Sequence, residues 1–404
     1  MTTTAPRPAP SVLDGRGARP LLDGQRTTGE QLLVKVFVAV PLLALLAAVP
    51  LAWGWGLSWI DIGLAVFFYL LSGFGITVGF HRHFTHRAFK ATRALRIGLA
   101  IAGSMAFQGA IITWVADHRR HHAFTDKEGD PHSPWRFGTT PAAVAKGFVY
   151  AHVGWLFERD QTNAARFAPD LLGDRDICRV NRQFLGWSLL SLTVPALLGG
   201  LITWSWWGAA TGFFWAGLVR IAALHHVTWS INSICHMTGT RPFTVRDRST
   251  NFWPLAIVSM GESWHNFHHA DPTSARHGVF RGQPDMSARL IAILEKLGWA
   301  YDIRWPTPRR LARLIDRQHV EPGDSGGPAQ YRRRPPRQAA GRPGEGSIGH
   351  CWARSAESSS LRSCSWPRPL LGPGCGEGTG VRPLGSPGQP GVWRSCRPLK
   401  RHLR

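Results

Sequence analysis

Four long apolar segments, arranged in two pairs, dominate the pattern of hydrophobic and polar positions along the chain. They cover residues 36–57, 62–80, 184–204 and 206–224. Each is about as long as the roughly 20 residues that a helix needs to cross a bilayer. Only the last contains a charge, Arg220, near one end where its side chain could extend to the membrane surface. The pattern predicts an all-α integral membrane protein with four transmembrane helices in two hairpins.

The distribution of basic residues predicts which side of the membrane each connection faces. The short connections at 53–61 and 205–212 contain no Lys or Arg, whereas a basic stretch from Arg82 to Arg96 follows the second apolar segment. Positively charged loops stay in the cytoplasm. We therefore expect both hairpin turns to face outward and the long middle region to face the cytoplasm.

Composition separates the two ends of the chain from the part between them. Residues 1–30 lack the apolar core and cleavage site of a secretory signal and are predicted to form a disordered arm. Residues 321–404 are rich in Pro, Gly, Ser and Arg and are predicted to form a disordered, low-complexity tail. This tail carries +9 of the net charge of +22 and no folded nucleic-acid-binding motif. Residues 31–310 are the expected membrane domain, and no nucleic-acid partner is expected.

Two clusters of three histidines stand at helical spacing. Each has histidines at positions i, i+3 and i+4: His118, His121 and His122 in "HRRHH", and His265, His268 and His269 in "HNFHH". These positions share one face of an α-helix, so three imidazole rings could converge on a transition metal. One cluster alone could equally be the solvated end of a basic helix, but two clusters with further histidines nearby favour a metal site.

Two further pairs lie at predicted cytoplasmic ends of apolar segments, His81 and His86 in "HRHFTH" and Asn232 and His236 in "NSICH". Residues i and i+5 are about 140° apart on a straight α-helix, so we expect the helix that carries His81 to end or bend before His86. Nine histidines are too many for one metal ion and predict two sites, with four and five ligands. Asn232 is a candidate tenth ligand that acts through water.

A fifth uncharged segment, residues 97–115, is also long enough to cross the membrane. If it did, His118 and His81 would lie on opposite sides, roughly 30 Å apart at about 1.5 Å per residue. A shared metal site excludes that separation. We therefore expect 97–115 to be a buried or re-entrant segment on the cytoplasmic side, covered by protein.

Four fragments resemble the membrane fatty-acid desaturases, specifically the stearoyl-CoA Δ9 desaturase type: "GFHRHFTHRAFKA", "WVADHRRHHAFTDKEGDPHSP", "TWSINSICHMTGTRPF" and "GESWHNFHHADP". The resemblance covers roughly residues 30–305. It implies four transmembrane helices beneath a cytoplasmic helical cap, a di-iron centre held by the nine histidines, and an acyl chain in a kinked tunnel. The implied reaction uses O2, two electrons and two protons, forms a cis double bond and releases two waters.

The resemblance also implies partners. The sequence contains no haem-binding, flavin or nicotinamide fingerprint, so electrons must come from a separate donor such as a ferredoxin, a cytochrome b5-like protein or a flavin reductase. Arg87, Lys90 and Arg93 are candidates to bind an anionic head group, and Trp229 is a candidate for the tunnel wall.

The stretches "QGAIITWVADH" and "HVGWLFERDQ" carry fewer basic residues than those of animal acyl-CoA enzymes, which resembles the bacterial branch. The expected location is a bacterial cytoplasmic membrane, among membrane lipid, with the active site facing the cytoplasm. The acyl carrier stays open between CoA, a lipid and acyl carrier protein.

Other interpretations of the histidines stay open at this level. A membrane hydroxylase or alkane monooxygenase could use the same di-iron oxidant, and a metal transporter would need ligands near the bilayer midplane. Asp117, Asp130 and Glu262 adjoin the clusters and could orient ligand rings. The histidines off the ligand spacing are expected to form hydrogen bonds rather than bind metal: His83, His132, His152, His225, His226 and His277.

Overall fold

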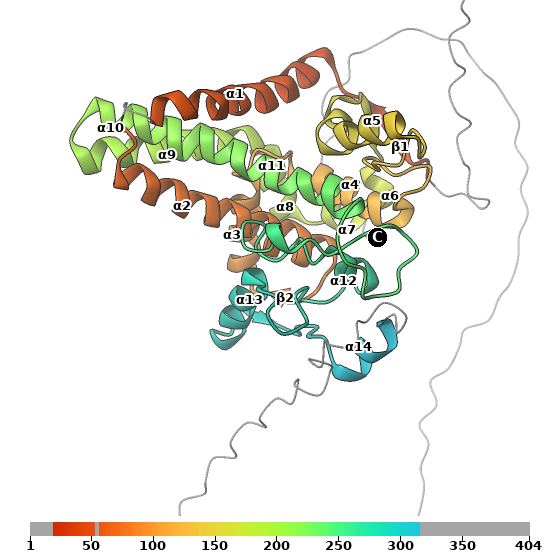
Figure 1. The fold of residues 1–404 in the computed structure, drawn as a ribbon. Coiled ribbons are helices and arrows are strands. Elements are labelled where there is room, and N and C mark those ends of the chain that lie inside the picture. Colours follow the sequence, from red (N-terminus) through yellow and green to blue (C-terminus); the bar gives the residue numbers. More distant parts are fainter. Residues whose placement is uncertain (1–18, 53–55, 316–404) are drawn as a thin grey trace, which may run out of the picture. The chain divides into compact units, whose positions relative to one another are not determined.

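Two helical hairpins run through the computed structural model, which describes residues 19–52 and 56–315 (Figure 1). The hairpins are built from α1 (Thr28–Ala52), α2 (Trp59–Phe74), η1 (Gly75–Thr85), α9 (Phe184–Thr203), α10 (Trp206–Thr211), η3 (Gly212–Val219), α11 (Arg220–Ser233) and η4 (Ile234–His236). Within the described residues, four continuous helical stretches are long and apolar enough to span a membrane: Thr28–Ala52, Trp59–Thr85, Phe184–Thr203 and Trp206–His236. This confirms the predicted four transmembrane helices in two hairpins.

The second and fourth of these spans change from α to π winding part-way along, in η1 and η3. A π-helix has i→i+5 hydrogen bonds and often marks a functional site. The backbone N–H of His86 donates to the carbonyl of His81 at 3.1 Å, and η1 ends at Thr85. The helix therefore ends between the two histidines, as predicted, and its wide last turn leaves their ring centroids 4.9 Å apart.

The segment predicted not to cross the membrane is broken into two shorter helices, α3 (Arg93–Ser104) and α4 (Ile111–Phe124). Between them Phe107 and Gly109 have φ angles of 62° and 104°, and positive φ cannot continue a right-handed helix. α3 packs against η1, and its last residues are buried. Residues 97–115 thus form no continuous span, which agrees with the prediction of a buried segment.

The remaining elements form a helical cap, most of it at the end of the hairpins opposite α10 (Figure 1). Its helices are α5 (Pro141–His152), α6 (Ala164–Phe167), α7 (Pro169–Leu172), α8 (Arg175–Arg182), α12 (His265–Ala270), α13 (Met286–Lys296) and α14 (Pro308–Leu314), with the 3-10 turns η2 (Gly154–Phe157) and η5 (Trp253–Leu255). Two short antiparallel pairs join β1 (Leu22–Gln25) to β3 (Asp160–Thr162) and β2 (Lys90–Ala91) to β4 (Ala300–Tyr301).

Residues 22–30, which the sequence analysis assigned to a disordered arm, instead form β1 and the first turn of α1. The backbone N–H of Arg26 donates to the carbonyl of Arg159 at 2.8 Å, and Gln31 Nε2 donates to the carbonyl of Phe157 at 2.8 Å. These pairings with a distant segment order a stretch that has no apolar pattern of its own. Residues 1–18 and the predicted tail at 321–404 lie outside the described residues.

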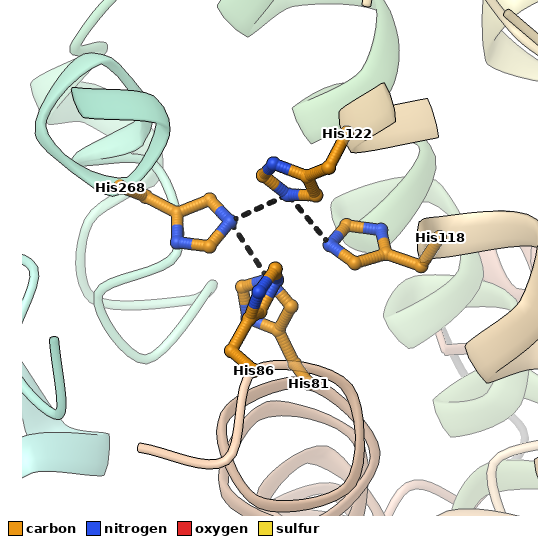
Figure 2. Close-up of side chains that lie close together, drawn as sticks. All are labelled: His81, His86, His118, His122 and His268. Carbon is orange, nitrogen blue, oxygen red and sulfur yellow. Dashed lines mark hydrogen bonds between the residues drawn. The ribbon is translucent and has the colours of Figure 1, made fainter. Parts of the chain in front are cut away.

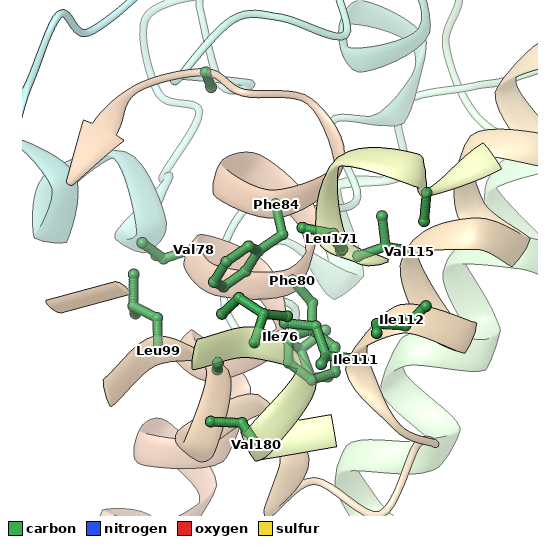
Figure 3. Close-up of a cluster of buried hydrophobic side chains, with 14 of the residues drawn as sticks. Ile76, Val78, Phe80, Phe84, Leu99, Ile111, Ile112, Val115, Leu171 and Val180 are labelled. Atoms are coloured by element: carbon green, nitrogen blue, oxygen red, sulfur yellow. The ribbon is translucent and has the colours of Figure 1, made fainter. Parts of the chain in front are cut away.

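A hydrophobic core lies where η1, α3, α4 and α8 meet (Figure 3). Phe80 and Val78 of η1, Ile111 and Val115 of α4, and Ile177 of α8 are all fully buried. Each such side chain contributes about 1.5–3 kcal/mol of transfer free energy. This core fixes η1 against α4, the two helices that carry most of the predicted ligands of one metal site.

Arg220 does not extend to the membrane surface, so that prediction is wrong. Its side chain is 3% exposed and lies between the hairpins. The guanidinium donates to the carbonyls of Ala216 and Ser191 at 2.9 Å and to Ser72 Oγ at 3.2 Å. Backbone and hydroxyl oxygens from three helices thus replace the water that the charge would otherwise need.

Gly75 offers a sharp test of the packing between η1 and α3. A Cβ there would overlap backbone atoms of Ala102 and Gly103. We expect Gly75→Ala to destabilise the protein by about 1–3 kcal/mol, because overpacking a close backbone contact forces the helices apart. Thermal melting in detergent measures this. Gly63→Ala is the matched control, since a Cβ on Gly63 meets no atom of the described residues within 4 Å. An equal fall in both variants would contradict the packing argument.

Candidate metal centre

All nine predicted histidines converge where η1, α4, η4 and α12 meet, in two groups. The group of five contains His81, His86, His118, His122 and His268, and the group of four contains His121, His236, His265 and His269. Within each group, one ligand atom of every histidine lies within 4.8 Å of those of the others. The structure therefore brings together four separate stretches of chain, in the five and four split that the sequence suggested.

The five rings of the first group surround one small space, with His268 on one side of it (Figure 2). Its Nε2 lies 3.0 Å from Nε2 of His81 and 2.9 Å from Nε2 of His122, which is 3.2 Å from Nε2 of His118. The ring of His86 lies 4.7 Å from that of His268, centroid to centroid. Rings from η1, α4 and α12 thus point at one small volume.

The group of four is centred on His265. Its Nε2 lies 3.0 Å from Nε2 of His236 and 3.0 Å from Nε2 of His269. The ring of His121 faces those of His236 and His269 at centroid distances of 5.1 and 5.3 Å. Because His121 comes from α4 between His118 and His122, that helix lies between the groups and contributes to both.

Four carboxylates contact the outer nitrogens of these rings. The pairs are His81 Nδ1 with Glu262 at 2.5 Å, and His121 with Asp130, His236 with Asp126 and His269 with Asp247, each at 3.0 Å. Such contacts fix the tautomer and orientation of a metal-binding ring. Asp130 and Glu262 were expected in this role from the sequence, whereas Asp126 and Asp247 were missed. No spacing signal marks Asp247, which is 22 positions from His269.

The positions of the hydrogens on these rings indicate whether a metal ion fits between them. In their neutral form His236 and His269 donate Nδ1–H to carboxylates, and each then presents an Nε2 lone pair to His265 Nε2. That nitrogen carries at most one hydrogen and cannot satisfy both neighbours. A cation placed among the three nitrogens removes the conflict, and imidazole nitrogen suits iron, zinc, copper and nickel.

Burial favours the form of histidine that binds metal. It lowers the pKa values of His118, His122, His265 and His268 well below the usual range, because the charged form loses hydration. Metals bind the neutral ring. The donor set therefore fits two histidine-rich transition metal sites.

Asp130 allows a test of the carboxylates. Its Oδ1 accepts from His121 Nδ1 and its Oδ2 from the backbone N–H of Asp126 at 2.8 Å. We expect Asp130→Asn to weaken metal binding about 10–100-fold, since an amide cannot accept at both positions. Metal content after dialysis against graded chelator measures this. Asp302→Asn is the control, because that carboxylate pairs only with exposed Lys90 among the described residues; equal metal loss in both would contradict the role of Asp130.

An apolar cavity reaches both histidine groups. Its wall contains His81 and His118 of the first group and His265 of the second. It also contains Trp229 and Asn232, two predicted site residues. Further wall residues include Phe37 and Val38 of α1, Ile76 of η1, and Gln108, whose Nε2 donates to Thr228 Oγ1 at 2.9 Å. A long apolar molecule in this cavity would lie against histidines of both groups.

The structure does not bring Arg87, Lys90 and Arg93 to this cavity. Arg87 pairs with Asp170 at 2.8 Å, Lys90 with Asp302 at 2.8 Å, and Arg93 with Asp176 at 2.7 Å. Arg87 and Lys90 line a separate, more polar hollow. Asp117, which was expected to orient a ligand ring, lines the apolar cavity instead.

The histidines outside the two groups form hydrogen bonds or lie beside the groups. His83 pairs with the carbonyl of Phe89 at 3.1 Å and His225 with the carbonyl of Ala106 at 3.0 Å, while His152 and His226 contact each other at 3.0 Å. His132 stacks on His121, with centroids 4.3 Å apart, and His277 lies 3.6 Å from Glu262. These last two extend the polar surroundings of the groups.

Comparison with known proteins decides the family. The family model for fatty acid desaturases matches residues 57–305, which include three of the four candidate spans and all nine histidines. The chain belongs to the fatty acid desaturase family. It is therefore an oxidoreductase of lipid metabolism, and its four apolar helices make it a membrane protein.

Relatives of this desaturase differ in the acyl carrier that their names specify. This chain is 40% identical over 278 residues to a hex-5-enoyl-[acyl-carrier protein] acetylenase of Moorena producens, and the match covers 68% of this chain and 87% of that protein. It is 34% identical over 271 residues to an sn-1 stearoyl-lipid 9-desaturase of Anabaena variabilis, covering 66% and 91%. It is 36% identical over 242 residues to a probable acyl-CoA desaturase of Schizosaccharomyces pombe, covering 59% and 48%.

Proposed function

We propose that the protein introduces a cis double bond, at the Δ9 position, into a saturated acyl chain held as a CoA or related thioester. One observation carries this proposal: the apolar cavity has histidines of both groups in its wall. A methylene has no acidic proton, so a general base or nucleophile is of no use. The overall reaction converts two CH2 groups, O2, two electrons and two protons into a cis CH=CH unit and two waters.

The nine histidines are proposed to hold two iron ions, His81, His86, His118, His122 and His268 around one and His121, His236, His265 and His269 around the other. Two irons would supply the O2-dependent oxidation of an unactivated C–H bond. Asn232, which lines the same cavity as His265, is the proposed water-mediated ligand. The neutral nitrogen donors leave the carboxylates free to orient the rings.

The cavity's own residues position the substrate. Aromatic and aliphatic side chains exclude water and hold the acyl chain, and Trp229 is proposed to be one of them. The hydrogen bond from Gln108 to Thr228 joins the α3–α4 connection to α11 across the cavity wall. That contact limits how the chain can run past His81 and His118, so it favours one pair of carbons.

The location and electron supply follow from the same proposal. The basic stretch after η1 supports an orientation in which the histidines lie on the cytoplasmic side of a bacterial membrane. Electrons are proposed to come one at a time from a separate ferredoxin, cytochrome b5-like protein or flavin reductase. The acyl carrier is proposed to be CoA, with lipid and acyl carrier protein as the carriers to compare in an assay.

Expression in a bacterium that lacks its own desaturases tests the function. Gas chromatography and mass spectrometry of the fatty acids should show a new cis alkene, and derivatisation of that alkene should place it at Δ9. A hydroxy fatty acid would instead support a hydroxylase, and an alkyne would support an acetylenase like the Moorena producens relative. Purified protein with a chemical reductant and defined acyl-CoA, acyl-lipid and acyl-carrier-protein substrates then identifies the carrier.

A further inference from the structure

A single surface segment, Arg246 to Arg248, contacts one histidine of the group of four directly and a second through a carboxylate. Asp247 Oδ2 accepts a hydrogen bond from His269 Nδ1 at 3.0 Å. The backbone N–H of Arg248 donates at 2.9 Å to Asp126 Oδ2, and the same oxygen accepts from His236 Nδ1 at 3.0 Å. The segment is therefore one or two hydrogen bonds from two candidate ligands.

The same segment reaches solvent. Arg246 and Arg248 are exposed, and the Asp247 side chain is 12% exposed, whereas that of His269 is only 1% exposed. Arg248 also covers the ring of Trp135 at 4.0 Å, and Trp135 Nε1 donates to the carbonyl of His236 at 3.0 Å. One layer of side chains thus separates solvent from the group of four.

The surface around this segment is basic. Among the described residues, neither Arg246 nor Arg248 has an ion-pair partner. The Asp247 carboxylate between them pairs with His269 instead. α14 packs beside it: the backbone N–H of Thr244 donates to the carbonyl of Leu314 at 2.9 Å. That helix adds the exposed Arg309 and Arg313. α12 and α14 lie away from the α10 turn (Figure 1), on the side that the proposed orientation turns toward the cytoplasm, where a soluble carrier protein would arrive.

We propose that residues 246–248 and α14 form the docking surface for an acidic one-electron carrier protein, and that electrons enter at the contact between Asp247 and His269. The proposal rests on the proposed function, which needs two electrons per double bond. Each docked carrier gives up one electron and leaves oxidised, so two dockings supply the pair that is consumed with two protons and O2. Complementary charge speeds such encounters and makes them depend on salt.

Binding of a plant-type [2Fe–2S] ferredoxin, an acidic carrier, to the purified protein in detergent tests the surface directly. We expect binding to weaken as ionic strength rises and the charge reversals R246E and R248E together to weaken it at least tenfold, a change of about 1.4 kcal/mol. The control pair R289E and K296E makes the same charge change on exposed positions of α13 and should leave binding unchanged. Equal binding by wild type and R246E/R248E, or no binding by wild type, would overturn the proposal.

Two further measurements separate the causes of failure. R309E/R313E alters the same surface without approaching the histidines and should also weaken binding, so a misfolded R246E/R248E protein does not decide the question. If charge reversal lowers binding to anionic vesicles but not to ferredoxin, the surface is a lipid contact and the proposal is wrong. Wild-type protein with dithionite as sole reductant reports the proposed function by itself: no alkene there counts against the function, whatever the ferredoxin binding.

Discussion

Replacing His268 with alanine should abolish double-bond formation and empty the group of five. His268 Nε2 lies within 3.0 Å of Nε2 of both His81 and His122, so its loss removes a nitrogen that contacts ligands from both η1 and α4. The expected loss exceeds the roughly 10–100-fold effect of removing an outer hydrogen-bond partner of a ligand. Alkene yield per protein by gas chromatography, with metal content per protein, measures both effects. The same exchange at His121 tests the group of four.

His152→Ala is the matched control for this prediction. His152 belongs to neither group and contacts His226 at 3.0 Å and Ser233 Oγ at 3.1 Å. We expect it to keep its metal and most of its activity. Full activity in the His268 variant, or equal metal loss in the His152 variant, would refute the proposed ligand set.

The sequence was sufficient for the spans and for the clustering of histidines, because both depend on local rules. A run of about 20 apolar residues has few structures open to it, and the i, i+3, i+4 spacing places three rings on one helix face without knowledge of the rest. The broken segment at 97–115 was predictable because two predictions conflicted. Hydropathy alone predicted a fifth membrane span, whereas a metal site shared by His81 and His118 excluded it.

What the sequence could not give depends on partners far apart in the chain. Asp126 and His236 are 110 positions apart, and no local pattern relates them. In the sequence Arg220 lies near one end of an apolar segment. In the structure its side chain is buried and donates hydrogen bonds to oxygens of three other segments. The ion pairs of Arg87 with Asp170 and of Lys90 with Asp302 were likewise not predictable, because the acidic partners are distant in sequence.

Exchange of Arg82 for methionine should cause the largest loss of stability. Arg82, in η1 next to His81, is fully buried. Its guanidinium contacts Glu262 Oε1 at 3.1 Å and Asp285 Oδ1 at 3.0 Å, and it donates to the carbonyl of Ala275 at 2.8 Å. Methionine has similar length but leaves two buried carboxylates without a positive partner, which costs about 3–5 kcal/mol. Melting in detergent should fall by on the order of 10 °C, and metal content should fall too, because Glu262 also holds His81.

The charge explanation can be separated from lost packing. Adding Glu262→Gln and Asp285→Asn to Arg82→Met removes the unpaired carboxylates and should restore part of the melting temperature, whereas loss of packing volume would persist. Metal content should not recover in the triple variant, because the amide introduced at position 262 offers His81 no carboxylate. Arg93→Met is the surface control: that arginine pairs with Asp176 but is 73% exposed, and solvent screens such pairs. If the Arg82 and Arg93 variants melt at the same temperature, the buried network does not stabilise η1. The orientation of the His81 ring must then depend on the hydrophobic core between η1 and α4.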